Sequence, residues 1–155
     1  MRDELIEAWR TNNRINLLLI DRISSEGMKA TLSKRGGRGV AGEFAHIHTN
    51  RVWQLEKRAK DLATGLNKFP AGTVPTKAAL KKALKASGDA IEELLVGALE
   101  KRPKRRGFKK GLFTSLSYYV AHEAHHRGRI LLTLKVASHT LDRKTQMAIW
   151  AWDQL

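Results

Sequence analysis

The chain has 155 residues and no cysteine, and its 29 Lys and Arg against 15 Asp and Glu give a formal charge of +14. A hydrophobic fraction of 42% and a charged fraction of 28% are typical of a globular protein and exclude a disordered chain. The lack of cysteine excludes disulfides, thiol nucleophiles and thiolate metal sites, so any transition metal must be held by His and carboxylate. The length predicts a single domain over residues 1–155.

Two features of the chain bear on where the protein works. The longest run of large aliphatic side chains, residues 17–20, is far shorter than the about 20 apolar residues that span a bilayer. Residues 2–4 are charged, and no apolar stretch leading to a small-residue cleavage site follows them, as it would in a secretory signal. We therefore expect a cytoplasmic protein that does not enter the membrane.

The spacing of apolar residues predicts helices along the chain. The first is expected over Asp3–Ile23, and a basic, glycine-rich connection over Ser24–Gly39 follows it. A second helix is predicted over Val40–Leu66 and is followed by a turn region over Asn67–Pro75. The third helix is predicted over Thr76–Leu99, with its first residue as the N-cap.

The C-terminal third continues this pattern. A basic loop, Lys101–Lys110, precedes a fourth helix over Leu112–Val136. The tail contains Ile149, Trp150 and Trp152, which predict a short final helix; exposed tryptophans there would permit a homodimer. No segment has sustained strand alternation, so the sequence predicts an all-α, four-helix bundle of the antiparallel type with a short C-terminal helix.

The histidines gather on two of the predicted helices. His122 and His126 are four residues apart, so they share one face of the fourth helix and continue its apolar stripe. Two imidazoles on the buried face of a bundle are costly unless a partner satisfies them, and a bound metal would satisfy both. On the second helix, His46 and His48 point to different sides, so only one is expected to join the pair. His125 is turned about 100° from its neighbour, which favours a hydrogen-bonding role.

The stretch His122–His126 also matches H-E-x-x-H, the zinc-protease pattern in which two His bind zinc and Glu activates water. After it, the chain offers only His139, Asp142 and Asp153 as a third ligand, and no strand pattern predicts a substrate-binding sheet edge. We therefore do not favour a peptidase. Two roles stay open for Glu123: an acceptor that orients a ligand histidine, and a solvated surface position, which we slightly favour.

Two stretches resemble the signatures of the DinB/YfiT-like superfamily. Residues 45–48, Ala-His-Ile-His, followed by Arg51 and Trp53, are similar to the first metal-ligand helix of that family. Residues 121–128, Ala-His-Glu-Ala-His-His-Arg-Gly, are similar to its second signature, H-x-x-x-H-R-G. The resemblance spans nearly the whole chain, and it implies a four-helix bundle with an up-down-down-up connection.

The resemblance also implies a metal site with one His from the second helix and two from the fourth. Carried onto this chain, the ligands are His46, His122 and His126. Because hydrophobic periodicity places His48 on the buried stripe of its helix, His48 is kept as the substitute for His46. Three His with open coordination positions are expected of a catalytic site, and such ligands accept zinc, nickel, iron or manganese.

Characterised relatives in that superfamily include metal-dependent transferases that use low-molecular-weight thiols and a thiol-dependent isomerase. The resemblance therefore implies a metal-dependent enzyme of the thiol S-transferase or hydrolase type that acts on a small molecule. The metal would bind and activate a thiol or water as the nucleophile.

The positive charge supports an alternative function. Lys101–Lys110 has seven basic residues in ten, and Lys34, Arg35 and Arg38 form a second basic stretch. Such segments attract nucleic acid or small anions, although no known nucleic-acid-binding motif accompanies them here. A solvated loop is the favoured interpretation. The alternative is a basic nucleic-acid-binding module in which the His cluster is structural.

Overall fold

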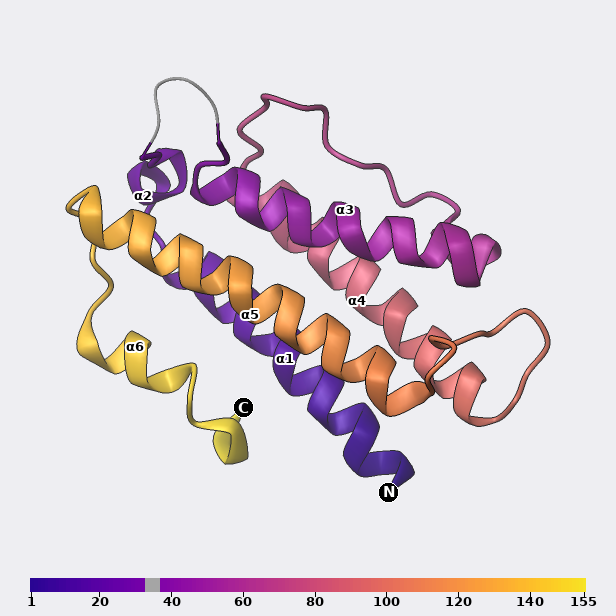
Figure 1. Cartoon of the computed structure of the whole chain (residues 1–155). Helices are drawn as coiled ribbons and strands as arrows, with labels where there is room; N and C mark the ends of the chain where they lie inside the picture. Colours follow the sequence, from indigo (N-terminus) through magenta and orange to yellow (C-terminus); the bar gives the residue numbers. More distant parts are fainter. Residues whose placement is uncertain (33–36) are drawn as a thin grey trace.

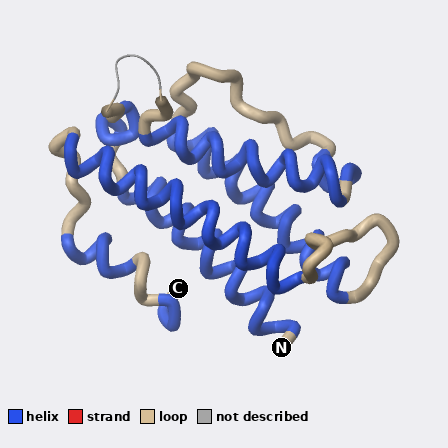
Figure 2. Tube along the Cα trace, in the orientation of Figure 1, coloured by secondary structure: helices blue, strands red, loops and turns tan. Residues whose placement is uncertain are grey.

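The computed structural model describes residues 1–32 and 37–155, and every regular element in these ranges is a helix (Figure 1, Figure 2). Four long helices lie together as a bundle: α1 (Arg2–Arg22), α3 (Val40–Arg58), α4 (Lys77–Leu99) and α5 (Leu112–Val136). Four short elements complete the described chain: α2 (Ser25–Lys29), η1 (Lys60–Ala63), α6 (Arg143–Ala148) and η2 (Trp152–Gln154). None of the described helices combines the length and apolar character that crossing a bilayer requires.

The four long helices form a closed ring of neighbours. Both α1 and α3 pack against α4 and α5, so α1 and α3 occupy opposite corners of the bundle. In Figure 1, α1 and α5 run in one direction, and α3 and α4 run in the other. The long connection 59–76 carries the chain back along α3 before α4 begins, so the neighbours α3 and α4 are parallel instead of antiparallel.

Capping and backbone geometry account for where the helices begin and end. The Thr76 hydroxyl accepts a hydrogen bond from the Ala79 N–H at 3.2 Å, as expected of the N-cap of α4. Helix α5 begins and ends at the predicted residues. The second helix is shorter than predicted, because Ala59 leaves the helical conformation (φ −158°, ψ 66°) and the chain continues as η1. Leu62 and Leu66 still pack against the core, which explains why the apolar pattern extends beyond the helix.

The segment predicted as a plain connection between the first two long helices contains α2. The Ser24 hydroxyl caps this helix by accepting a hydrogen bond from the Gly27 N–H at 3.0 Å, and Met28 is buried. Five residues are too few for hydrophobic periodicity to reveal, so the sequence predicted the connection here without its short helix.

The core consists of two apolar clusters with a polar layer between them. One cluster is built around Ile15, Leu19, Phe44, Leu80, Leu84, Ile130 and Leu134, and the other around Leu5, Trp9, Leu55, Ile91, Leu95 and Tyr119. Along α1, α3 and α5, the residues between the two clusters include the buried polar side chains Asn12, Asn16, Arg51, Glu123 and Arg127. Because unpaired buried charges are costly, these side chains must satisfy one another.

Candidate metal centre

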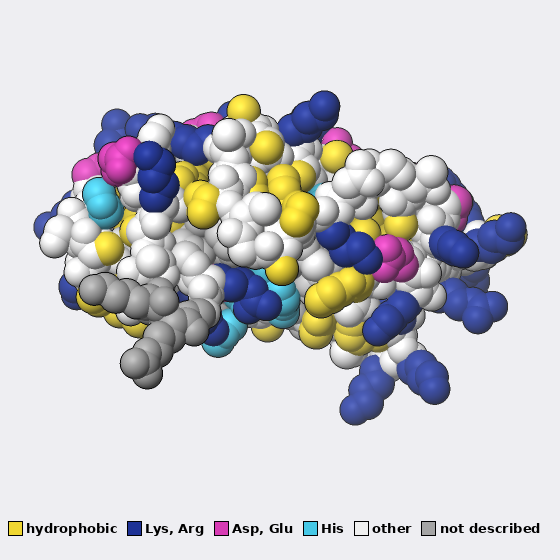
Figure 3. Space-filling model, turned by 90° about the horizontal axis from the view of Figure 1, so that it is seen from above, with side chains coloured by type: hydrophobic (Ala, Val, Ile, Leu, Met, Phe, Trp, Pro, Cys, Tyr) yellow, Lys and Arg dark blue, Asp and Glu magenta, His cyan; other side chains and the backbone are white. Residues whose placement is uncertain are grey.

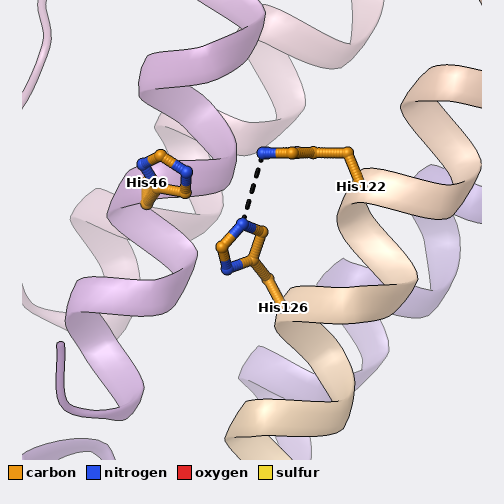
Figure 4. Close-up of side chains that lie close together, drawn as sticks. All are labelled: His46, His122 and His126. Atoms are coloured by element: carbon orange, nitrogen blue, oxygen red, sulfur yellow. Dashed lines mark hydrogen bonds between the residues drawn. The ribbon is translucent and has the colours of Figure 1, made fainter. Parts of the chain in front are cut away.

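Three histidines from two helices converge where α3 faces α5 (Figure 4). His46 comes from α3, and His122 and His126 come from α5; each offers a ring nitrogen, and these nitrogens all lie within 4.8 Å of one another. The His46 ring centroid is 4.5 Å from that of His126 and 5.3 Å from that of His122. His126 is buried and the other two are half-buried. The cluster therefore lies in the wall of the bundle, where it can hold a metal ion and remain open on one side.

The two α5 histidines already have the spacing of ligands on one ion. Their Nε2 atoms are 3.2 Å apart. Two bare nitrogen lone pairs at this distance repel unless a proton or a cation lies between them. Zinc–nitrogen bonds of about 2.0–2.1 Å in a tetrahedral site place neighbouring ligand atoms about 3.3–3.4 Å apart. The donor set of three imidazoles and the spacing of its α5 pair therefore fit a divalent transition metal.

Glu43 orients one of the ligand candidates. Its buried carboxylate lies with Oε2 2.5 Å from Nδ1 of His126, so the ring donates its Nδ1 hydrogen and keeps Nε2 free. Arg129 approaches the other carboxylate oxygen, with Nε 2.9 Å from Oε1. Glu43 was not predicted from the sequence, although a signal existed: it precedes His46 by three residues, on the same face of α3.

His122 has a comparable partner in Asn50. The Nδ1 atom of this ring is 3.3 Å from Nδ2 of Asn50, and the Tyr118 hydroxyl donates to Oδ1 of the same amide at 3.2 Å. Rotating the amide by 180° turns its oxygen toward Nδ1, which then donates and leaves Nε2 of His122 free for a metal. The Tyr118 hydroxyl both donates and accepts, so it serves either orientation.

Burial keeps the three rings neutral. It lowers the pKa of His46 to about 4, with the charge of Arg38 contributing in the same direction. Burial likewise lowers the pKa of His126 to about 4 and moves the pKa of His122 downward. Metal ligation requires neutral imidazole, so near pH 7 these rings are in the form that binds an ion.

The other two candidate histidines lie outside the cluster. His48 is buried, as its place on the apolar stripe predicted, but its Nε2 lies 3.0 Å from the carbonyl oxygen of Asn67 and its ring packs on Phe69. Of the two α3 candidates, the structure therefore brings only His46 to the α5 pair. His125 is exposed, with its ring 5.1 Å from that of His126, and the predicted hydrogen bond is not found within residues 1–32 and 37–155.

The expectation of a solvated Glu123 was wrong. This carboxylate is 1% exposed, and Arg51 donates to both of its oxygens at 2.7 and 2.8 Å. Asn12 and Asn16 each donate to Oε2 at 2.7 Å, and Arg127 lies 3.9 Å away. Burial alone would raise the pKa of Glu123, but the charge and hydrogen bonds of Arg51 hold it below its ordinary value. A carboxylate bound in this way cannot serve as the general base of an H-E-x-x-H protease.

The basic loop is partly neutralised within the fold. Arg102 pairs with Glu93 at 2.8 Å, and Arg105 donates two hydrogen bonds to Asp61 at 2.9 and 2.7 Å. The remaining basic side chains of the loop are exposed and have no ion pair with the described residues: Lys101, Lys104, Arg106, Lys109 and Lys110. The predicted second basic stretch is described only at Arg38, since Lys34 and Arg35 lie outside the described residues.

The C-terminal tail contributes apolar side chains to the core. Ile149 is buried there, whereas Trp150 and Trp152 are 74% and 39% exposed. Exposed tryptophans would permit the expected homodimer, which stays a prediction.

No known protein family, curated protein or solved structure matches the chain. Function must therefore be argued from the geometry of the site and from the resemblance of its motifs.

The contact between Glu43 and His126 leads to a direct prediction. Glu43→Gln should weaken zinc affinity by about 10- to 100-fold, because an uncharged amide supports the ligand ring less well than a carboxylate. Competition with a chromogenic chelator measures this affinity. The matched control is Glu56→Gln, which neutralises an exposed carboxylate on the same helix and should leave zinc affinity unchanged. Equal affinities for the two variants would contradict a supporting role for Glu43.

Proposed function

We propose that the chain is a DinB/YfiT-like metal-binding protein in which His46, His122 and His126 hold a divalent transition metal such as zinc, nickel, iron or manganese. The convergence of the three rings, with two Nε2 atoms 3.2 Å apart, is the observation that carries this proposal. The course of the helices supports it as well, because the parallel pair α3 and α4 is what an up-down-down-up connection requires.

We further propose that this protein is a metal-dependent enzyme of the thiol S-transferase or hydrolase type. Three neutral imidazoles leave an ion with its full charge and with open positions, which is typical of catalytic sites. A divalent metal held in this way supplies the Lewis acidity that lowers the pKa of a water or a thiol. The substrate class is a small molecule, with a low-molecular-weight thiol as the expected co-substrate.

The chain's own residues have supporting roles in this proposal. Glu43 holds a proton at Nδ1 of His126, and Asn50 does the same for His122 after rotation of its amide. The Tyr118 ring stacks on the His122 ring, with 5.7 Å between the ring centroids, and limits rotation of the histidine. These contacts keep both Nε2 atoms directed toward the same point, so the site is organised before a ligand arrives.

Elemental analysis of the purified, untagged protein tests the proposal. We expect about one metal ion per chain, and its loss in the variant His122→Ala/His126→Ala. The control is His125→Ala/His139→Ala, which removes two histidines outside the cluster and should keep the metal. A wild-type protein without metal, even after incubation with zinc and nickel, would overturn the proposal, and so would equal metal content in both double variants. A positive result justifies a screen of thiol-transfer and hydrolytic reactions.

A further inference from the structure

A groove of about 800 Å³ lies beside the histidine cluster. His46, on the flank of α3, forms part of its wall, and the connection 68–73 forms the opposite wall. In Figure 3, histidine side chains lie in the lower part of the face, with basic and apolar side chains beside them. A ligand in this groove would therefore lie next to the candidate metal centre.

The floor of the groove is made by small side chains of α3. Gly42, Ala45 and Thr49 follow one another at spacings of three and four residues, which places them on one face of the helix. Phe69 and Pro70 rise opposite this face from the connection. Because the floor residues are small, the space between the two walls remains open.

The charged side chains found in the lining of the groove are positive. Its lining includes Arg38, Lys68 and Arg129, and among the described residues it includes no Asp or Glu. Lys68 pairs with Glu56 outside the groove at 2.8 Å, and Arg129 contacts Glu43. No partner of the Arg38 guanidinium is found among the residues that the structure describes. A cleft lined by one sign of charge concentrates ions of the opposite sign, so this groove attracts anions.

The groove also has an aromatic surface. Trp53 lines it and is 46% exposed, and Phe69 contributes a second ring. The Lys68 ammonium lies 5.9 Å from the centre of the Trp53 ring, so the apolar face and the positive charge are adjacent. A small ligand that bears an anionic group on a flat apolar body matches both features.

We propose that this groove binds a small aromatic anion, a molecule with a carboxylate or phosphate group beside a flat ring. Arg38 and Lys68 contact the anionic group, and Trp53 contacts the ring. The inference that this molecule is a substrate rests on the proposed function, whereas its binding does not require the metal. The proposal adds to that function the chemical class of the molecule that would lie next to the metal centre.

Calorimetric titration of the whole chain, with and without zinc, tests the proposal. The probes are phenyl phosphate, benzoate and neutral phenol. We expect at least one of the two anions to bind in both states and phenol to bind more weakly, and the better anion identifies the charged group. Arg38→Gln and Lys68→Gln should each weaken binding by about three- to tenfold. The control is Lys60→Gln, an exposed lysine outside the groove, and it should change nothing.

The outcomes separate the groove from the metal centre. Anion binding that requires zinc and is unaffected by Arg38→Gln would overturn the proposal that the groove binds the anion. The proposed metal centre would not be affected. Anion binding weakened by Arg38→Gln in a protein that takes up no metal would support the groove and overturn the proposed function. If neither anion binds in either state, the inference is wrong. Circular dichroism of each variant shows whether its fold is retained.

Discussion

Glu123→Gln is expected to lower the free energy of unfolding by about 3–5 kcal/mol, the usual cost of removing one partner from a buried ion pair. Glu123 faces two guanidinium groups, Arg51 and Arg127, which are almost fully buried. Glutamine keeps the shape of the side chain but removes the charge, and both cations are then left without a counter-charge in a medium of low dielectric constant.

Urea denaturation followed by circular dichroism measures this change. For a chain of this length, the same loss corresponds to a fall in Tm of about 6–20 °C. The matched control is again Glu56→Gln, whose exposed pair with Lys68 should contribute less than about 1 kcal/mol. A loss below about 1 kcal/mol for Glu123→Gln would contradict the structural role assigned here. The H-E-x-x-H protease hypothesis predicts instead that stability is retained and a hydrolytic activity is lost.

Arg51 explains why this layer also matters for the candidate metal centre. Besides the carboxylate, it donates to the side chain of Asn13 and to the carbonyl oxygen of Leu84, both at 2.9 Å, and its guanidinium lies 4.8 Å from the centre of a Trp9 ring. One α3 side chain thus contacts α1, α4 and α5. If α3 slid by one turn, the buried charge of Arg51 would lose these partners. The buried polar layer therefore fixes the register of α3 against α5. The same register determines the distance between His46 and the α5 histidines.

The sequence pattern was sufficient for most of the fold. Hydrophobic periodicity gave the bounds of α5, and the Thr76 cap gave the beginning of α4, because both signals are local. The i,i+4 spacing placed His122 and His126 together for the same reason. Periodicity could not select between His46 and His48, because it identifies the core face of a helix. The cluster lies on the flank of α3, and only the helix arrangement shows that this flank meets α5.

The polar layer could not be predicted from a single sequence. Asn12 and Glu123 are separated by 111 positions, and nothing local in the chain links them. A charged residue within a helical pattern is normally assigned to solvent, which is why Glu123 was misplaced. Asn50 and Glu43 are different, since both lie at helical spacing from His46, so a search for polar side chains at these positions would have found them.

Zinc is expected to raise the free energy of unfolding, and the increment should persist to lower pH than for exposed histidines. At a free concentration 100 times its Kd, a ligand that binds only the folded chain contributes about 2.7 kcal/mol. Protons compete for the same nitrogens. Because burial lowers the pKa of His46 and of His126 to about 4, and also lowers the pKa of His122, protons compete less with zinc at these rings than at exposed histidines.

The metal-free protein should show the complementary behaviour. An unfolded chain binds protons on these rings near their ordinary pKa of about 6.5, whereas the folded chain does not. Between about pH 6.5 and pH 4 the unfolded state therefore binds more protons, and metal-free stability falls as the pH falls through this window. Over the same window the zinc increment should decline only at a lower pH than it would with exposed histidines as ligands.

Thermal unfolding at a series of pH values, with and without zinc, measures both effects. In His122→Ala/His126→Ala the zinc increment should be absent at every pH, because two of the three ring donors are gone. A zinc increment that already declines between about pH 7 and pH 6 would indicate ligands with the pKa of exposed histidines, and it would contradict the half-buried centre. An increment of equal size in the double variant would locate zinc elsewhere on the chain.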